Sequence, residues 1–123
     1  MLPKSNRLKK ENDFRKILRG GESARGNFLV LKAARNSLGK VRVGISVSKK
    51  ISKKATLRNK IKRRLAACLK PKIPQIKEGL DLFLIALPGL ETKNFSETKK
   101  ECDSLFKKAR ILKNDGEIIS KNN

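Results

Sequence analysis

The sequence contains no histidine, and this absence excludes much enzyme chemistry. Without histidine the chain can form neither a Ser-His nor a Cys-His catalytic pair, and it lacks the commonest general base near neutral pH. Cys68 and Cys102 lie far apart in the sequence, which predicts buried thiols rather than a disulfide or a zinc site. No carboxylates cluster in the basic region, so a two-metal nuclease centre is not expected. We therefore predict no catalytic residue and no metal site in this chain.

Long apolar runs are missing as well. The longest, from Leu80 to Leu87, is much shorter than the ~20 residues that span a bilayer, and it contains Asp81. The N-terminal stretch "MLPKSNRLKKEN" lacks the apolar middle of a secretory signal. These features predict a cytoplasmic protein without a membrane segment.

Acidic residues are scarce: 11 Asp and Glu stand against 32 Lys and Arg, a formal net charge of +21 in 123 residues. In a small domain so many Lys and Arg side chains repel one another, and a bound polyanion reduces that repulsion. Nucleic acid is the leading explanation, and an anionic membrane surface is the weaker alternative.

The imbalance is greatest between Lys49 and Lys77, where there is no Asp or Glu at all. An ordinary solvated helix face mixes Glu with Lys, since oppositely charged i,i+4 pairs stabilise a helix. Like charges at this spacing, such as Arg58 with Lys62, instead cost about 0.2–0.5 kcal/mol per pair. The pattern therefore favours contact with a polyanion over a merely solvated face.

The elements predict one α+β domain over residues 1–113, followed by a frayed tail over 114–123. Three segments have helical spacing, namely 11–21, 53–69 and 95–112. In the first of these Ile17 is expected in the core, and in the last Ser96 is the expected cap. Strands are predicted over 27–34, 41–48 and 79–89, with the first two joined as a hairpin.

Periodicity also assigns faces to these elements. In helix 53–69 the apolar stripe comprises Leu57, Ile61, Leu65, Cys68 and Leu69. In strand 27–34, Leu29 and Leu31 alternate with Phe28, Val30 and Lys32. In strand 41–48 one face is apolar, and the other is small and polar, with Arg42, Gly44, Ser46 and Ser48. That polar face admits either close approach by another chain or ordinary solvent.

The run "SVSKKISKKATLRNKIKRRL", residues 46–65, closely resembles the signature of the bacterial ribonuclease P protein family. In that family an Arg-Asn pair is followed, two residues later, by a Lys-Arg pair. The segments "NRLKKENDF", "VRVGISVSKK" and "LFLIALPG" are similar to other parts of the family. The resemblance covers about residues 5–112.

The resemblance implies a four-stranded sheet packed with about three helices and a left-handed β-α-β crossover, a fold also found in one domain of a ribosomal protein. It implies that an RNA subunit, using Mg²⁺, hydrolyses precursor tRNA to release the 5′ leader. The protein would bind that catalytic RNA, one protein per RNA, and would hold the leader in a cleft between the first helix and the sheet.

The resemblance also assigns roles to residues. The expected contacts with the catalytic RNA are Lys49, Lys50, Lys54, Arg58, Asn59, Lys62, Arg63 and Arg64. The expected leader cleft comprises Phe14, Leu18, Phe28, Lys32 and Ser46. Aromatic rings in such a cleft stack on bases, and each stacked base contributes about 1–3 kcal/mol.

Three positions depart from the family pattern. Ala66 stands where an arginine is frequent, Lys32 where the cleft strand commonly has an aromatic residue, and Leu87 where a basic residue is frequent.

Two other functions are compatible with the composition. The chain could be a structural RNA-binding protein, such as a ribosomal component, or a DNA-binding regulator.

Overall fold

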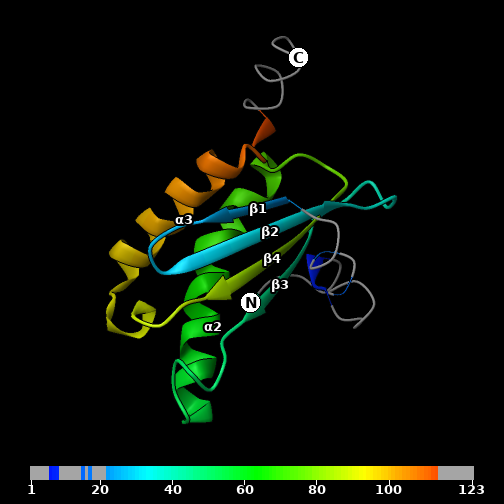
Figure 1. Cartoon of the computed structure of the whole chain (residues 1–123). Helices are drawn as coiled ribbons and strands as arrows, with labels where there is room; N and C mark the ends of the chain where they lie inside the picture. Colours follow the sequence, from blue (N-terminus) through cyan, green and yellow to red (C-terminus); the bar gives the residue numbers. More distant parts are fainter. Residues whose placement is uncertain (1–5, 9–14, 16, 18–21, 114–123) are drawn as a thin grey trace.

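The computed structural model describes residues 6–8, 15, 17 and 22–113 (Figure 1). Within them a four-stranded sheet is formed by β1 (Glu22–Arg25), β2 (Leu29–Arg35), β3 (Arg42–Ser46) and β4 (Leu80–Ala86). The helices are α2 (Ala55–Leu69), α3 (Phe95–Ala109) and the short 3-10 turns η2 (Lys70–Gln75) and η3 (Leu90–Thr92). Of the predicted first helix, Arg15 and Ile17 are helical, and most of the remainder lies outside the described residues.

The strand order is β1-β2-β4-β3. Strand β4 pairs antiparallel with β2 and parallel with β3, while β1 pairs antiparallel with β2. The predicted hairpin between the first two strands is therefore wrong, because β4 lies between β2 and β3. The most apolar strand takes a central position, where both of its edges are paired.

A parallel pair needs a crossover connection, and here α2 provides it between β3 and β4. Figure 1 shows α2 behind the sheet as the chain passes from β3 to β4, which makes the crossover left-handed. About 98% of such connections are right-handed, so this handedness is a distinctive property of the fold. It agrees with what the family resemblance implies.

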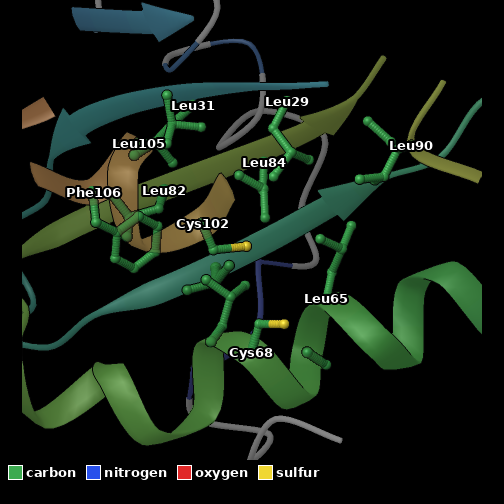
Figure 2. Close-up of a cluster of buried hydrophobic side chains, with 14 of the residues drawn as sticks. Leu29, Leu31, Leu65, Cys68, Leu82, Leu84, Leu90, Cys102, Leu105 and Phe106 are labelled. Atoms are coloured by element: carbon green, nitrogen blue, oxygen red, sulfur yellow. The ribbon is translucent and has the colours of Figure 1, made fainter. Parts of the chain in front are cut away.

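The core lies between the sheet and the helices α2 and α3 (Figure 2). Leucines of β2 and β4 meet Leu65 of α2 and the pair Leu105 and Phe106 of α3, and all are almost fully buried. The predicted stripe of α2 is confirmed, with Ile61, Leu65, Cys68 and Leu69 buried and Leu57 half-buried. Ile17 is also buried, as predicted, although it does not belong to this main cluster.

Cys68 and Cys102 are both buried in this core and both free, as predicted (Figure 2). A hydrogen bond from the Cys102 thiol lowers the pKa of Cys68, whereas the same bond and burial raise the pKa of Cys102. Both thiols pack in the core of the protein.

Helix α3 begins at a different residue from the one predicted. Asn94, not Ser96, is the N-cap, and its side chain accepts a hydrogen bond from the Glu97 N–H at 2.8 Å. The Glu97 carboxylate accepts in return from the Asn94 N–H at 3.1 Å. This reciprocal pair is a capping box, which satisfies two backbone donors at once.

Candidate nucleic-acid interface

Two surfaces contain the residues expected to contact RNA. One is the outer face of the sheet, opposite to α2 and α3, and the other is α2 with the loop that precedes it. We define the basic ridge as the exposed cations of this second surface, namely Lys49, Lys50, Lys53, Lys54, Lys60, Lys62 and Arg63. No helix among the described residues is long and apolar enough to span a membrane.

Strand register places two of the predicted cleft residues, Lys32 and Ser46, together on the outer face of the sheet. Phe83 of β4 lies between Lys32 of β2 and Gly44 of β3, and the next row pairs Ile85 with Val30 and Ser46. The alternation predicted for the first two strands is thus confirmed in the structure. Phe83 was not among the residues predicted for the cleft, because a continuous apolar run gives no alternation from which to assign its face.

At one end of this face, Arg42 is committed to an internal ion pair. Its Nε and Nη2 donate to the two carboxylate oxygens of Asp81 at 2.8 and 2.7 Å. Asn36 Nδ2 donates to the same carboxylate at 2.7 Å. Because Asp81 is buried, these bonds satisfy a charge that would otherwise be costly. Arg42 therefore holds the sheet together at this end.

Two of the predicted cleft residues, Phe14 and Leu18, lie outside the described residues. Phe28 immediately precedes β2 and is half-buried against the core. A Cβ atom at Gly89 would lie only 2.8 Å from its ring, and the Lys93 ammonium lies 4.5 Å from the ring centroid. A base could stack on Phe28 only if Lys93 moved, so its role in binding the leader stays a prediction.

Short hydrogen bonds order the loop at the start of the basic ridge. The hydroxyls of Ser48 and Ser52 accept from the backbone N–H groups of Lys50 and Lys54 at 3.3 and 3.1 Å. Arg58 Nη1 donates to the Ser52 carbonyl at 2.9 Å. Arg58 is thus half-buried and positions the lysines of this loop, in addition to any contact of its own with RNA.

The remaining predicted contacts on α2 differ in exposure. Asn59, Lys62 and Arg63 point away from the core and are exposed. Arg64 is half-buried, and its Nη1 donates to the Lys93 carbonyl at 2.8 Å, which ties α2 to the segment before α3. Ala66 is buried, so in this chain its position faces the protein and not the surface.

The basic ridge is electrostatically unbalanced in the folded chain as well as in the sequence. Among the described residues, none of its cations forms a salt bridge. Lys53 and Lys60 were not singled out as contacts, although both are as exposed as Lys62. Lys60 lies on the outer arc of α2 and Lys53 lies in the loop before it, so the sequence pattern could have identified both. The ridge therefore presents exposed positive charge that the described residues do not neutralise.

The family model for ribonuclease P matches residues 2–110 of the chain. The chain belongs to this family. Curated relatives bear the name Ribonuclease P protein component. One from Dictyoglomus turgidum is 42% identical over 91% of this chain and 95% of its own length, and one from Pseudanabaena sp. is 36% identical over 91% and 97%.

Solved structures agree with this assignment to the ribonuclease P proteins. The RNase P protein from Staphylococcus aureus aligns with a TM-score of 0.83 and 31% identity, covering 89% of this chain and 99% of that one. The RNase P protein from Thermotoga maritima aligns with a TM-score of 0.75 and 28% identity, covering 83% and 96%. The predicted family and its α+β fold are thereby confirmed, and the ribosomal and DNA-binding alternatives are not favoured.

Proposed function

We propose that this ribonuclease P protein binds a catalytic RNA through its basic ridge and the 5′ leader of precursor tRNA on the outer face of its sheet. In this proposal one protein joins one RNA in the cytoplasm, and the RNA subunit with its Mg²⁺ hydrolyses the phosphodiester bond. The observation that carries the proposal is the basic ridge itself, a strip of exposed cations without a single carboxylate among them.

The N-terminus of α2 supports contact between the ridge and phosphate. Lys54 is the N-cap, but no side chain caps the helix, and the first turn contains no acidic residue. The free N–H groups and the positive end of the helix dipole attract an anion, as do the neighbouring lysines. Along the helix, the Arg63 guanidinium can grip phosphate in a bidentate fork, and Asn59 can both donate and accept hydrogen bonds.

The outer face of the sheet supports binding of an extended strand. On one side of this face lie the small residues Gly44, which is buried, and Ser46, which is half-buried. Phe83 is half-buried in the middle of the face, and Lys32 provides a cation next to it. This arrangement combines a stacking surface with a positive charge, which is how proteins commonly hold single-stranded RNA. Phe83 also offers an aromatic ring directly opposite Lys32, the position where the family commonly has one.

The chain's own residues supply no alternative metal centre in the part that the structure describes. There, no group of three or more Cys, Asp or Glu residues is placed to hold an ion. The proposal accordingly leaves Mg²⁺ to the phosphates of the RNA. The cations of the protein would lower the repulsion between two polyanions, the catalytic RNA and the precursor tRNA.

A cleavage assay tests the proposal. Precursor tRNA is incubated at low Mg²⁺ with the matching RNA subunit, with and without the full chain. We expect the chain alone to be inactive and the mixture to cleave at a Mg²⁺ concentration at which the RNA alone is slow. Cleavage by the chain alone, or no change in the Mg²⁺ requirement, would contradict the proposal.

A binding comparison tests the leader-binding part separately. Phe83→Ala should weaken binding of precursor tRNA more than binding of mature tRNA, because only the precursor has a leader to stack. The matched control is Phe95→Ala, since Phe95 is an exposed ring on α3, far from this face in the fold. Equal losses for the two tRNAs would remove Phe83 from the leader site.

A further inference from the structure

A second positively charged surface lies at the other edge of the molecule. A groove runs between the edge strand β1 and helix α3, which lie side by side in Figure 1. Three cavities of about 620, 350 and 390 Å³ make up this groove, and all three have Lys108 in their walls. Strand β1 is at the opposite edge of the sheet from β3, so the groove is distinct from the basic ridge that follows β3.

The largest cavity has more cations than carboxylates around it. Arg35, Lys77, Lys108 and Arg110 line it together with a single acidic residue, Glu22. These four cations come from the end of β2, the segment after η2, helix α3 and its C-cap. Within residues 22–113 none of them forms a salt bridge. The cavity therefore concentrates positive charge that the protein does not neutralise.

The remaining lining residues of this cavity are aliphatic. They are Ala33, Ala34, Leu80, Ala109 and Ile111. Its volume of about 620 Å³ is within the range of about 300–1,000 Å³ typical of small-ligand sites. A hollow that combines aliphatic side chains with several cations suits a nucleotide, whose base has apolar faces and whose phosphate is anionic.

Arg110 adopts a conformation that its side chain does not favour. It is the C-cap of α3, with φ 57° and ψ 43°, the left-handed region. Helices most often place glycine where the chain turns this way, because a Cβ atom is strained there. Such strain is most often found at functional sites. At Arg110 the strained position carries one of the cations of the cavity.

The groove continues past this cavity with more positive charge. Arg25 lines both smaller cavities, and the Lys108 ammonium donates to the Arg25 carbonyl at 2.8 Å. The other carboxylate of the groove, Glu101, accepts a hydrogen bond from the Phe28 N–H at 2.7 Å. The cations are thus spread along the groove rather than gathered at one point. An RNA strand, which repeats a phosphate at every nucleotide, matches that distribution.

We propose that the β1–α3 groove is a further RNA-binding site, in addition to the basic ridge and the outer face of the sheet, and that it takes a single-stranded segment with a nucleotide seated in the cavity beside Arg110. This site goes beyond the function proposed above and does not depend on the basic ridge. Together with the two surfaces proposed above, this groove would let one small protein hold a further RNA segment beside β1, at the sheet edge opposite to β3.

Binding of a fluorescein-labelled oligouridylate to the full chain, followed by anisotropy at increasing salt, tests the proposal. The cavity variant combines Arg35→Ala, Lys77→Ala and Arg110→Gly. The control variant combines Lys99→Ala, Lys100→Ala and Lys107→Ala, three exposed lysines of α3 that line none of the cavities. Both lose three charges. If the three cavity cations contact phosphates, the slope of log affinity against log salt should fall in magnitude by about 2, at about 0.7 per contact on a single strand.

The control should lose less than half as much of the slope. Equal losses in the two variants, or none in the cavity variant, would overturn the proposal. Competition by polyglutamate as strong as that by unlabelled oligouridylate would overturn the assignment to RNA. The same cavity substitutions placed in a Lys62→Ala, Arg63→Ala background should cause the same loss, because the two surfaces are separate. If Lys62→Ala with Arg63→Ala has no effect on RNA binding while the cavity substitutions weaken it, the function proposed above fails and this site stands.

The single variant Arg110→Gly distinguishes a loss of RNA binding from a loss of folding. Glycine removes the strain of the left-handed conformation together with the charge, so the melting temperature should rise while oligouridylate affinity falls. A purely structural Arg110 would not separate these two readouts in this way. Unchanged affinity would remove Arg110 from the site, and with it the cavity that the proposal depends on.

Discussion

Helices α2 and α3 have the same length of 15 residues and pack on the same core, but their charges are arranged differently. Helix α3 starts with the capping box of Asn94 and Glu97 and has Lys107 and Lys108 in its last turn. Helix α2 has Lys54 at its N-cap position, no side-chain cap and no acidic residue in its first turn. In α3 the charges complement the helix dipole at both ends, whereas in α2 the start of the helix opposes it.

The difference shows what each helix contributes. A cation at a helix N-terminus costs about 0.3–1 kcal/mol, and an absent cap costs about 0.5–2 kcal/mol. Helix α2 bears both costs, so its folding depends on the buried stripe that includes Ile61, Leu65 and Leu69. RNA bound on its outer side, as proposed above, would offset this electrostatic cost. Helix α3 has local stability of its own, which suits an element that holds the sheet from behind.

The largest effects should come from the core, where the two helices are alike. Leu65 of α2 and Leu105 of α3 are both almost fully buried. Leu65→Ala and Leu105→Ala should each lower the free energy of unfolding by about 2–5 kcal/mol, through lost burial and the cavity left behind. Urea denaturation measures both. A loss under about 1 kcal/mol at Leu65 alone would mean that α2 does not depend on its inner face.

Much of this core could be predicted from the sequence, because helical spacing is a local signal. The stripe of α2 and the alternation that buries Leu29 and Leu31 both follow from which residues recur at which interval. The positive character of the outer side of α2 could be predicted in the same way, from the lack of acids between Lys49 and Lys77.

Strand pairing could not be predicted, because it depends on contacts between distant residues. Strand β1 has four residues, of which Ala24 alone is buried, so it shows no strand-like pattern. The predicted β2–β3 hairpin was wrong because β4, which follows the whole of α2 in the chain, inserts between the two strands and pairs its Phe83 with Gly44. The groove between β1 and α3 was missed for the same reason, as its cations come from four separate segments.

The next largest effect should be on RNA affinity, where the two helices differ. Lys62→Ala with Arg63→Ala should weaken binding of the matching catalytic RNA at least tenfold, or about 1.4 kcal/mol, and should flatten its salt dependence by about 0.9 per lost duplex contact. Lys99→Ala with Lys100→Ala removes the same charge from the exposed side of α3 and should have a smaller effect. Filter binding at several salt concentrations measures both pairs. Equal losses would mean that net charge alone governs binding.

A smaller effect should come from the cap that α3 has and α2 lacks. Asn94→Ala removes the acceptor for the Glu97 N–H and should destabilise the chain by about 1 kcal/mol. Ser96 is exposed and lies two residues after Asn94, and Ser96→Ala should change stability by less than about 0.5 kcal/mol. Thermal melts of the two variants check this. The reverse order would make Ser96 the cap that the sequence pattern suggested.

The smallest effect, and the sharpest test of the comparison, should come from giving α2 the cap that it lacks. Lys54 already has the extended conformation of an N-cap residue, with φ −81° and ψ 119°. Lys54→Ser should therefore cap the helix without moving the backbone, whereas Lys54→Ala removes the charge and adds no cap. We expect Lys54→Ser to be more stable than Lys54→Ala by about 0.5–1 kcal/mol.

Both Lys54 variants should lose the same small amount of RNA affinity, because both lose one cation of the basic ridge. Stability and affinity would then respond to different properties of one side chain: stability to its ability to cap, and affinity to its charge. If Lys54→Ser instead bound RNA as tightly as the unmodified chain, the lysine would not be serving the RNA. The unfavourable start of α2 would then have no functional explanation, and the contrast with α3 would reflect the packing of the two helices alone.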